Sequence, residues 1–370
     1  MTKDRSKMAS SIGMFDTFKG IGMIMVVFGH TFSAFFPKVA DNPVLMVPML
    51  LLSLAGVSLM PAFLMISGYG FRKRPVGKCI RQQVSLLLKP YLYVAAATTV
   101  FHLVFHYAAF GYWPASVRET LKAAGGFLLA LPKSMEFFGL FFFGCGAVWY
   151  IIALFEGWVI LDVLMNRVDE KYMNAAVFLT VTAGWFSGWL ADRLTGGESA
   201  LPFCISQGMI AVGFIYMGYR LKKNKILLRH WTRREYAAVG AACGVTLILM
   251  LFSGKTDNMA EGIWIAGPVS MLADAAAGVG IILLILKCSR FENMLSRLLQ
   301  KIGRDSLLIF CIHTVEMIAV PWYLLQERYA EHPFLCSLLI LLLRGGIIMA
   351  AVQMIKFITR TGRKRKLAQQ

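Results

Sequence analysis

The residues whose types and spacing best suit chemistry are Asp16, Lys19 and His30, which lie within or at the edge of one apolar run. Ionisable side chains are costly in hydrocarbon, so they usually face a protein interior or an aqueous cavity when they occur there. At about 100° per residue, the step from Lys19 to His30 is three helical turns plus about 20°, and the step from Asp16 is about 40° short of four turns. All three side chains therefore share one stripe of a helix, with the imidazole roughly 16 Å deeper than the ammonium.

A histidine at that position has two chemical uses, because a neutral imidazole can accept a proton or attack a carbonyl carbon. The same spacing also fits a structural interpretation, in which Asp16 and Lys19 are interfacial anchors and His30 packs with one hydrogen bond. The spacing alone does not separate these interpretations.

A second group of candidates lies near the C-terminus, where His313 and Glu316 are one helical turn apart and face the same way. A carboxylate in hydrocarbon is expensive unless it is paired, and the available partners are His313, Arg344 and His30. Glu316 could orient one of the histidines, or the group could be a structural buried pair.

The elements that must position these residues are membrane helices. Hydrophobic residues make up 58% of the 370 residues, mean hydropathy is +0.63, and charged residues are only 16%. Several apolar runs reach the roughly 20 residues that a spanning helix needs. We predict an all-α, polytopic integral membrane bundle of about ten transmembrane helices, at residues 12–35, 44–70, 88–110, 147–165, 174–191, 201–219, 236–252, 263–286, 306–325 and 334–357.

The basic residues predict the orientation of this bundle. With the N-terminus in the cytoplasm, 29 of the 38 Lys and Arg residues fall in cytoplasmic segments, seven in external ones and two, Lys19 and Arg344, within spans. This is the positive-inside pattern, which places both termini in the cytoplasm. The net charge of +18 is therefore a topology signal and no sign of nucleic-acid binding, although it leaves a cytoplasmic face suited to anionic lipids or an anionic cofactor.

The rest of the chain reads as one membrane domain over residues 1–370, with a basic cytoplasmic tail at 359–370. No small-residue cleavage site follows the first apolar run, so we expect that run to remain in the mature protein. The one long external segment, 111–146, is expected to lie in the interface or dip partway into the membrane. The seven cysteines are scattered and suggest neither disulfides nor a zinc site. Walker-type and dinucleotide glycine patterns are absent, so ATP or NAD chemistry has no support.

Five blocks carry a resemblance to a known family: FDTFKGIGMIMVVFGHT (15–31), PAFLMISGYGFRKR (61–74), LLLKPYL (86–92), VWYIIALFE (148–156) and IGRDSLLIFCIHT (302–314). They resemble, in the same order, blocks of the membrane-bound acyltransferase family 3, which transfers acyl groups to sugar hydroxyls of cell-surface glycans. The family opens with Asp, a basic residue, ten residues and a His, here similar to Asp16, Lys19 and His30.

The resemblance implies a membrane-bound O-acyltransferase in the plasma (inner) membrane. Its donor would be acyl-coenzyme A, with acetyl-coenzyme A the expected form, used as a substrate and not as a bound cofactor. Its acceptor would be a hydroxyl of a surface polysaccharide or of its lipid-linked precursor. His30 would act as base or nucleophile, and Lys19 could pair with donor phosphates or with Asp16.

Two departures from the family pattern affect these expectations. Where many members carry Arg-x-x-Arg before the third span, this chain has Arg81-Gln82-Gln83-Val84, which leaves the donor-binding residues open. The sequence also ends near Gln370 without the soluble hydrolase-like domain that some members carry.

Further residues have two interpretations each. The basic cluster Arg72, Lys73, Arg74, Lys78, Arg81 and Lys89 could bind donor phosphates, or could serve only topology and lipid headgroups. Trp149 and Tyr150 could stack on a sugar or belong to an interfacial aromatic belt. His102 and His106 have the i, i+4 spacing of a metal pair, but no third ligand accompanies them, so we expect bonds to neighbouring helices and no metal site.

Two other function classes fit parts of this pattern. A transporter or a glycan or lipid flippase could use His30, Glu316 and Arg344 as a proton or substrate relay. The sequence shows neither inverted repeats nor broken helix pairs, and this counts against a transporter or flippase. A catalytically idle scaffold is the third class, and the Lys19–His30 stripe speaks against it.

The charge bias generates a topology prediction. In a cysteine-free background, single cysteines replacing Asn258 or Glu331 should react with an impermeant thiol reagent from outside, and those replacing Asn224 or Gln369 should not, because external loops carry few basic residues. External labelling at Asn224 would overturn this topology and make segment 111–146 a span.

Overall fold

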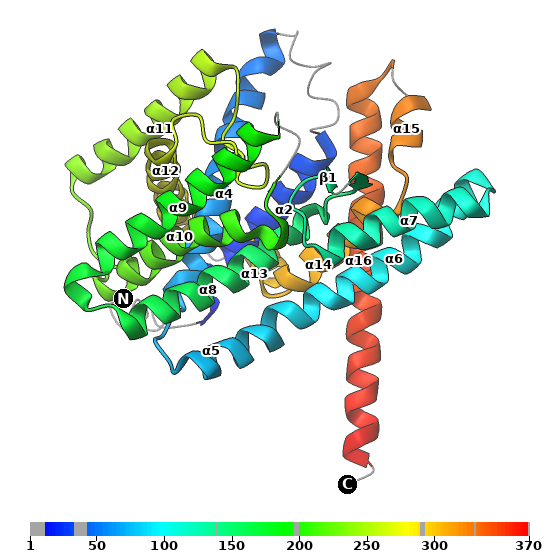
Figure 1. Ribbon diagram of the computed structural model, residues 1–370, viewed down its shortest axis with the longest axis horizontal. Coiled ribbons are helices and arrows are strands. Elements are labelled where there is room, and N and C mark those ends of the chain that lie inside the picture. Colours follow the sequence, from blue (N-terminus) through cyan, green and yellow to red (C-terminus); the bar gives the residue numbers. More distant parts are fainter. Residues whose placement is uncertain are drawn as a thin grey trace.

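The structure, a computed structural model, describes residues 12–32, 43–137, 139–195, 200–288, 293–328 and 331–368, and within these ranges it is almost entirely helical (Figure 1). The long helices are α2 (Asp16–Phe32), α4 (Pro43–Tyr69), α6 (Lys89–Phe110), α8 (Trp149–Arg167), α9 (Met173–Leu194), α10 (Ile205–Lys223), α11 (Arg233–Ser253), α12 (Pro268–Cys288), α14 (Ser306–Ala319) and α16 (Pro333–Ala368). The shorter elements are η1 (Ile12–Phe15), α5 (Val76–Gln83), η3 (Val84–Leu88), α7 (Trp113–Leu128), β1 (Met135–Phe137), β2 (Leu140–Phe142), η4 (Gly146–Val148), η5 (Glu170–Tyr172), η6 (Pro202–Cys204), α13 (Met294–Arg304) and α15 (Tyr323–Arg328).

Six helical segments within the described ranges are long and apolar enough to cross a membrane: Val76–Phe110, Gly146–Arg167, Pro202–Lys223, Arg233–Ser253, Pro268–Cys288 and Phe334–Thr359. Two further apolar helices, Gly56–Tyr69 and Ser306–Ala319, are shorter. The prediction of a helical polytopic membrane protein agrees with this finding. Residues 33–35 of the predicted first span and residues 369–370 of the predicted tail lie outside the described residues.

The segment expected as a cytoplasmic loop before the third span is helical from Val76 onward, and its placement in the cytoplasm stays a prediction. Helix α5 continues through the π-helical segment η3 into α6. Pro90 lacks the N–H that an uninterrupted α-helix would use at this point, and a π turn accommodates such a defect without ending the helix. Lys78 and Arg81 therefore lie on a helix.

The predicted span 306–325 is too long, because α14 ends at Ala319. Val320 is extended (φ −88°, ψ 125°), as expected for a residue before a proline, and Pro321 follows. Helix α16 ends at Ala368, eleven residues beyond the predicted end of the last span at residue 357. The described part of the basic tail is therefore helical.

The long segment 111–146 folds back against α6. Helix α7 runs antiparallel beside α6, as Figure 1 shows, and the Tyr91 hydroxyl donates a hydrogen bond to the Phe127 carbonyl. A two-stranded antiparallel hairpin, β1–β2, then leads the chain to α8. Within its apolar half, Phe127, Ala130 and Leu131 are buried, whereas Leu128 is exposed.

Glycines allow two helix pairs to meet backbone to backbone. A Cβ atom at Gly68 of α4 would lie 2.0 Å from the Ile215 carbonyl oxygen of α10, and one at Gly218 of α10 would lie 1.9 Å from the Met65 carbonyl oxygen of α4. Contacts this short exclude any side chain. The same device joins α2 to α13, where a Cβ at Gly303 would come within 1.7 Å of the Asp16 carbonyl oxygen. These contacts fix the helix that carries Asp16, Lys19 and His30.

Candidate active site

His30 lies in the last turn of α2, and its side chain is accessible although neighbouring groups surround it closely. Its ring lies beside that of His313 from α14, with the ring centroids 5.5 Å apart and the planes 39° apart. The structure therefore brings together the two histidines that the sequence places almost three hundred positions apart.

His313 is fully buried and is held by Glu316 one turn further along α14. The Nδ1 atom of His313 lies 2.7 Å from Oε1 of Glu316, and both side chains are almost completely inaccessible. Since a carboxylate accepts but does not donate, this contact makes Nδ1 the donor and fixes the tautomer of a neutral ring. The Nε2 atom, on the opposite edge of the ring, has no hydrogen-bond partner among the described residues.

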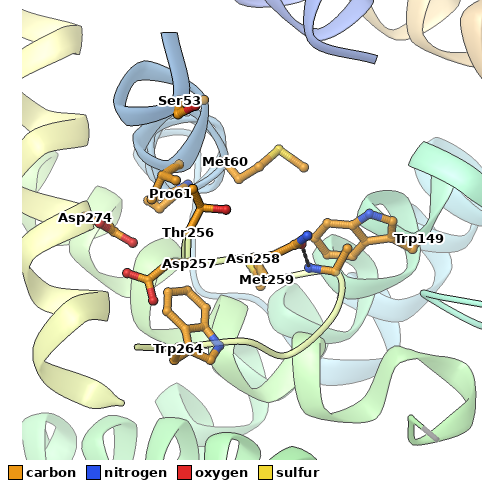
Figure 2. Close-up of a pocket in the computed structure, with 13 residues that line it drawn as sticks. Ser53, Met60, Pro61, Trp149, Thr256, Asp257, Asn258, Met259, Trp264 and Asp274 are labelled. Carbon is orange, nitrogen blue, oxygen red and sulfur yellow. Dashed lines mark hydrogen bonds between the residues drawn. The ribbon is translucent and has the colours of Figure 1, made fainter. Parts of the chain in front are cut away.

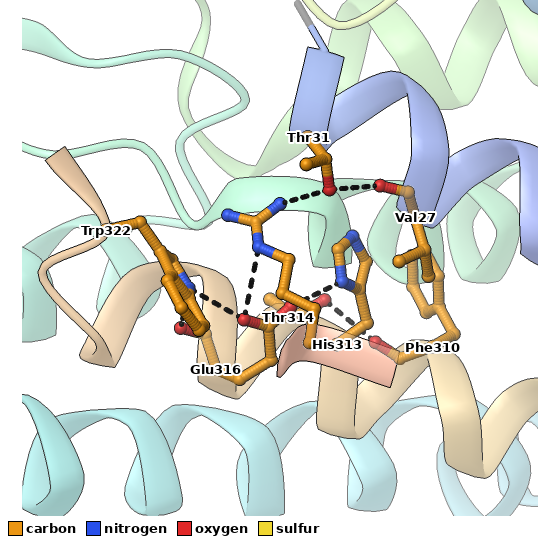
Figure 3. Close-up of polar contacts among 8 residues, drawn as sticks. Val27, Thr31, Phe310, His313, Thr314, Glu316 and Trp322 are labelled. Carbon is orange, nitrogen blue, oxygen red and sulfur yellow. Dashed lines mark hydrogen bonds and ion pairs between the residues drawn. The ribbon is translucent and has the colours of Figure 1, made fainter. Parts of the chain in front are cut away.

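The second oxygen of Glu316 has two further partners, as Figure 3 shows. Trp322 Nε1 donates to Oε2 over 2.8 Å, and Arg344 Nε lies 3.5 Å from the same oxygen. Trp322 reaches Glu316 because α14 breaks at Pro321 and turns the chain back. Arg344 Nη1 also donates to the Thr31 hydroxyl, the neighbour of His30, over 3.1 Å.

This array gives His313 the environment of a carboxylate-oriented histidine. Such a carboxylate orients the imidazole and stabilises the imidazolium that forms when the ring takes a proton. Arg344 balances the charge of Glu316, which is what a buried carboxylate requires. His313 and Glu316 were predicted from the sequence, and so was Arg344 as a partner. Trp322 and Thr31 were missed, because only the break at Pro321 and the fold of α16 bring them in.

Asp16 and Lys19 lie at the other end of α2. Lys19 Nζ is 3.5 Å from Asp16 Oδ1, the i, i+3 contact that the spacing predicts. Asp16 is buried and lies in the first turn of the helix, where a negative charge is stabilised by the helix dipole. The structure thus keeps this ion pair about three turns from His30.

Trp149 and Tyr150 open α8 in the interior of the bundle. Trp149 is buried, at 6% exposure, and Tyr150 packs edge-on against Phe310 of α14 and Phe63 of α4, with ring centroids 6.1 and 6.5 Å apart. An interfacial belt would place such rings at the lipid surface. Both residues instead lie beside the helix that carries His313.

The basic segment after α4 is fixed by two polar residues of α8 that the sequence analysis did not single out. Asp162 Oδ1 accepts a hydrogen bond from the Arg74 backbone N–H over 3.0 Å, and Asn166 Nδ2 donates to the Arg74 carbonyl over 2.7 Å. Asp162 and Asn166 are four residues apart in an otherwise apolar helix, and this spacing could have indicated that they share a polar partner.

One member of the predicted basic cluster, Lys73, lines a cavity of about 350 Å³ next to this segment. The other lining residues include Arg220 and Lys223, from the end of α10, and the aromatic residues Tyr216 and Tyr219. Lys223 is paired with Glu170, and Arg220 donates to the Tyr216 hydroxyl over 3.1 Å. Arg72, Lys78, Arg81 and Lys89 are exposed and do not line this cavity, and Arg74 is half-buried.

His102 and His106 bond to α7. His102 Nδ1 lies 2.8 Å from the Thr120 hydroxyl, and His106 Nδ1 lies 3.0 Å from the Ser116 hydroxyl. The described residues contain no group of three His, Cys, Asp or Glu side chains arranged to hold a metal ion.

Comparison with protein families assigns the chain to a family. The acyltransferase domain of acyltransferase family 3 matches residues 12–351, nearly the whole chain, so the chain belongs to that family. No curated protein and no solved structure matches it significantly. Membership in an acyltransferase family favours the enzyme interpretation over a transporter.

The buried array generates a stability prediction. Glu316→Ala should lower the free energy of unfolding by roughly 3–5 kcal/mol, because it leaves the Arg344 cation buried without its carboxylate. Thermal melting of the detergent-purified protein would measure the loss. Glu327→Ala, which removes an exposed glutamate of α15, is the matched control and should melt like the wild type. Equal melting of the two variants would show that Glu316 does not balance Arg344.

Proposed function

We propose that this protein is an integral membrane O-acyltransferase that moves an acyl group from acyl-coenzyme A, in the expected case acetyl-coenzyme A, to a hydroxyl of a surface polysaccharide or of its lipid-linked precursor. The observation that carries the proposal is the accessible His30 beside the buried, carboxylate-held His313. Family membership supplies the reaction class.

His30 is the proposed catalytic residue, and two routes fit its position. As a base, it takes the proton of the sugar hydroxyl while the oxygen attacks the thioester carbonyl; the C–O bond forms, the C–S bond breaks, and the proton passes to the departing thiolate. As a nucleophile, an imidazole nitrogen attacks the thioester carbonyl; the C–N bond forms, the C–S bond breaks and the thiolate leaves. The sugar oxygen then attacks the acyl carbon, the C–N bond breaks, and the hydroxyl proton passes to the thiolate. In both routes His30 carries positive charge transiently, next to the His313 ring that Glu316 holds in place.

The proposed donor site is the cytoplasmic cavity of Lys73, Arg220 and Lys223. Its cations suit phosphate oxygens, and Tyr216 and Tyr219 offer flat surfaces for an adenine ring. The exposed residues Arg72, Lys78, Arg81 and Lys89 and the half-buried Arg74 would surround its entrance and raise the local concentration of an anionic donor. Lys19, paired with Asp16 at the inner end of α2, is proposed to contribute a positive charge for the phosphates of the donor.

The membrane placement completes the proposal. Ten spans, both termini in the cytoplasm and residence in the plasma (inner) membrane would put the basic cavity on the side of coenzyme A. His30 would then lie in the outer half of the first span, within reach of an external glycan. The positive-inside distribution of basic residues supports this orientation.

Neutralising the donor cavity should weaken donor binding selectively. Lys73→Gln combined with Arg220→Gln should raise the KM for acetyl-coenzyme A about tenfold or more, since each lost charge-assisted hydrogen bond costs about 1.5–3 kcal/mol. The kcat should stay nearly unchanged, because the lost binding is common to ground and transition states. Lys171→Gln, an exposed cytoplasmic lysine outside the cavity, is the control. An unchanged KM together with altered cysteine labelling would mean that these charges serve topology alone.

Removing the imidazole of His30 should abolish activity. His30→Ala should lower acyl transfer by about 10²–10⁴-fold, the usual loss of a general base, without affecting membrane insertion or melting. Lys19→Ala should be milder and Lys19→Arg milder still, because the charge is kept. Radiolabelled acetyl transfer to membrane glycans is the measurement, and mass spectrometry of an acyl adduct on His30 separates nucleophile from base.

The matched control is His230→Ala, since His230 is an exposed loop residue. Near-normal glycan acylation by His30→Ala would end the catalytic role of His30 and return it to a packing role.

A further inference from the structure

The connection between α11 and α12 covers a cavity of about 270 Å³ that the proposed chemistry does not use. The connection folds back through backbone hydrogen bonds in both directions between Asn258 and Ile263, at 2.8 and 2.9 Å. Met60 and Pro61 of α4 and Trp149 of α8 line the opposite side (Figure 2). This volume lies just under the roughly 300–1,000 Å³ usual for small-molecule sites, so the cavity suits one small ring and not a long chain.

Two buried carboxyl groups line this cavity. Asp257 comes from the connection and Asp274 from α12, and they are 7% and 0% exposed. Figure 2 shows their carboxyl groups close together. One oxygen of each is committed: Asp257 Oδ1 accepts from the Ile265 N–H over 2.6 Å, and Asp274 Oδ1 accepts from the Thr246 hydroxyl over 3.1 Å. The Oδ2 atom of each has no donor among the described residues.

The surroundings of this pair disfavour two full negative charges. Burial raises the pKa of the Asp257 carboxyl above its ordinary value, and like charges next to each other oppose ionisation. The carboxyl oxygens give this wall of the cavity strong hydrogen-bond acceptors.

An independent observation comes from Trp264, which lines the same cavity. Its side chain is 9% exposed, and its Nε1 donor has no acceptor within the described ranges. Phe214 packs against the indole with ring centroids 6.4 Å apart and so helps to hold it in place. Leaving a buried donor unpaired is costly, so a polar ligand that supplies an acceptor would relieve that cost.

The unpaired groups specify the chemistry of the ligand. Carboxylate oxygens accept hydrogen bonds and an indole N–H only donates, whereas a hydroxyl group can do both. The flat rings of Trp264 and Trp149 offer apolar faces to a ring that carries such hydroxyls. Among the described residues, Asp257 and Asp274 are the charged side chains that line the cavity, so an anionic ligand would be repelled.

The cavity also lies close to the candidate active site. Trp149, which lines it, neighbours Tyr150 with ring centroids 6.2 Å apart, and Tyr150 packs against Phe310, one turn before His313. A single aromatic layer therefore separates this cavity from the helix that carries His313.

We infer that this cavity binds one neutral pyranose residue of the acceptor glycan, with Asp257 and Asp274 accepting from its hydroxyls and Trp264 donating to one of them. The inference rests on the proposed function, because it makes this ring part of the acyl acceptor. It also narrows the acceptor: a uronic acid or another acidic sugar is excluded from this position.

Titration calorimetry of the detergent-purified full-length protein tests the inference. The probes are the methyl glycosides of glucose, galactose and mannose, compared with glucuronic acid and with glucosamine. We expect at least one methyl glycoside to bind at least tenfold more tightly than glucuronic acid, because the charged side chains described at the cavity are both acidic. Tighter binding of glucosamine would identify a cation site, and tighter binding of glucuronic acid an anion site; either result overturns the inference.

Variants locate the binding. Asp257→Asn, Asp274→Asn and Trp264→Phe should each weaken binding about tenfold or more, and Trp264→Phe keeps the aromatic packing should an Asp variant fail to fold. Trp189→Phe and Asp192→Asn, at exposed positions of α9, are the matched controls and should bind like the wild type. Equal binding by the wild type and Trp264→Phe, or no glycoside binding by the wild type, overturns the inference.

The two proposals fail separately. His30→Ala should keep glycoside affinity while losing acyl transfer. Normal acyl transfer without glycoside binding refutes the sugar site and leaves the proposed function standing. Glycoside binding by a protein that never transfers an acyl group from acyl-coenzyme A refutes the proposed function, and with it the role of the sugar as acyl acceptor.

Discussion

The carboxylate of Glu316 is the constraint on which the candidate site depends. An ionised group within an apolar helical bundle persists only if its charge is balanced and its lone pairs are filled. Glu316 meets both conditions with three partners from three parts of the chain: His313 on its own helix, Trp322 beyond the Pro321 break, and Arg344 on α16. Satisfying one carboxylate thus brings α14 and α16 together, and Arg344 extends the link to α2 through Thr31.

Sequence periodicity and charge were enough to predict most of the helices. Each of the ten predicted segments corresponds to a helix, because hydrophobic length is a strong signal in membrane proteins. The errors are local and have backbone causes. Lys89-Pro90 was interpreted as a helix start, although a π turn carries the helix through it, and Pro321 was placed inside a span that it ends. The number of membrane spans and their orientation in the membrane remain predictions.

The candidate site was predictable only in part. The helical spacing of His313 and Glu316 and the need of a buried carboxylate for a partner predicted three candidate partners of Glu316: His313, Arg344 and His30. The structure pairs Glu316 with the first two. In contrast, nothing in the sequence indicated that Asp257 and Asp274 line one cavity, or that Lys73 and Arg220 line another. Which residues share a cavity depends on how connections fold over helix ends, and neither hydropathy nor charge counts report that.

The glycine contacts between α4 and α10 carry a consequence for motion. The backbone of α10 packs directly on Gly68, and the backbone of α4 packs directly on Gly218. The two helices are therefore in close contact at two neighbouring points. Sliding or rolling one helix over the other would drive a neighbouring side chain into a carbonyl group. Helices α4 and α10 therefore move as one rigid unit. Any rearrangement that admits or releases a bulky reactant has to take place in the other helices and in the connections.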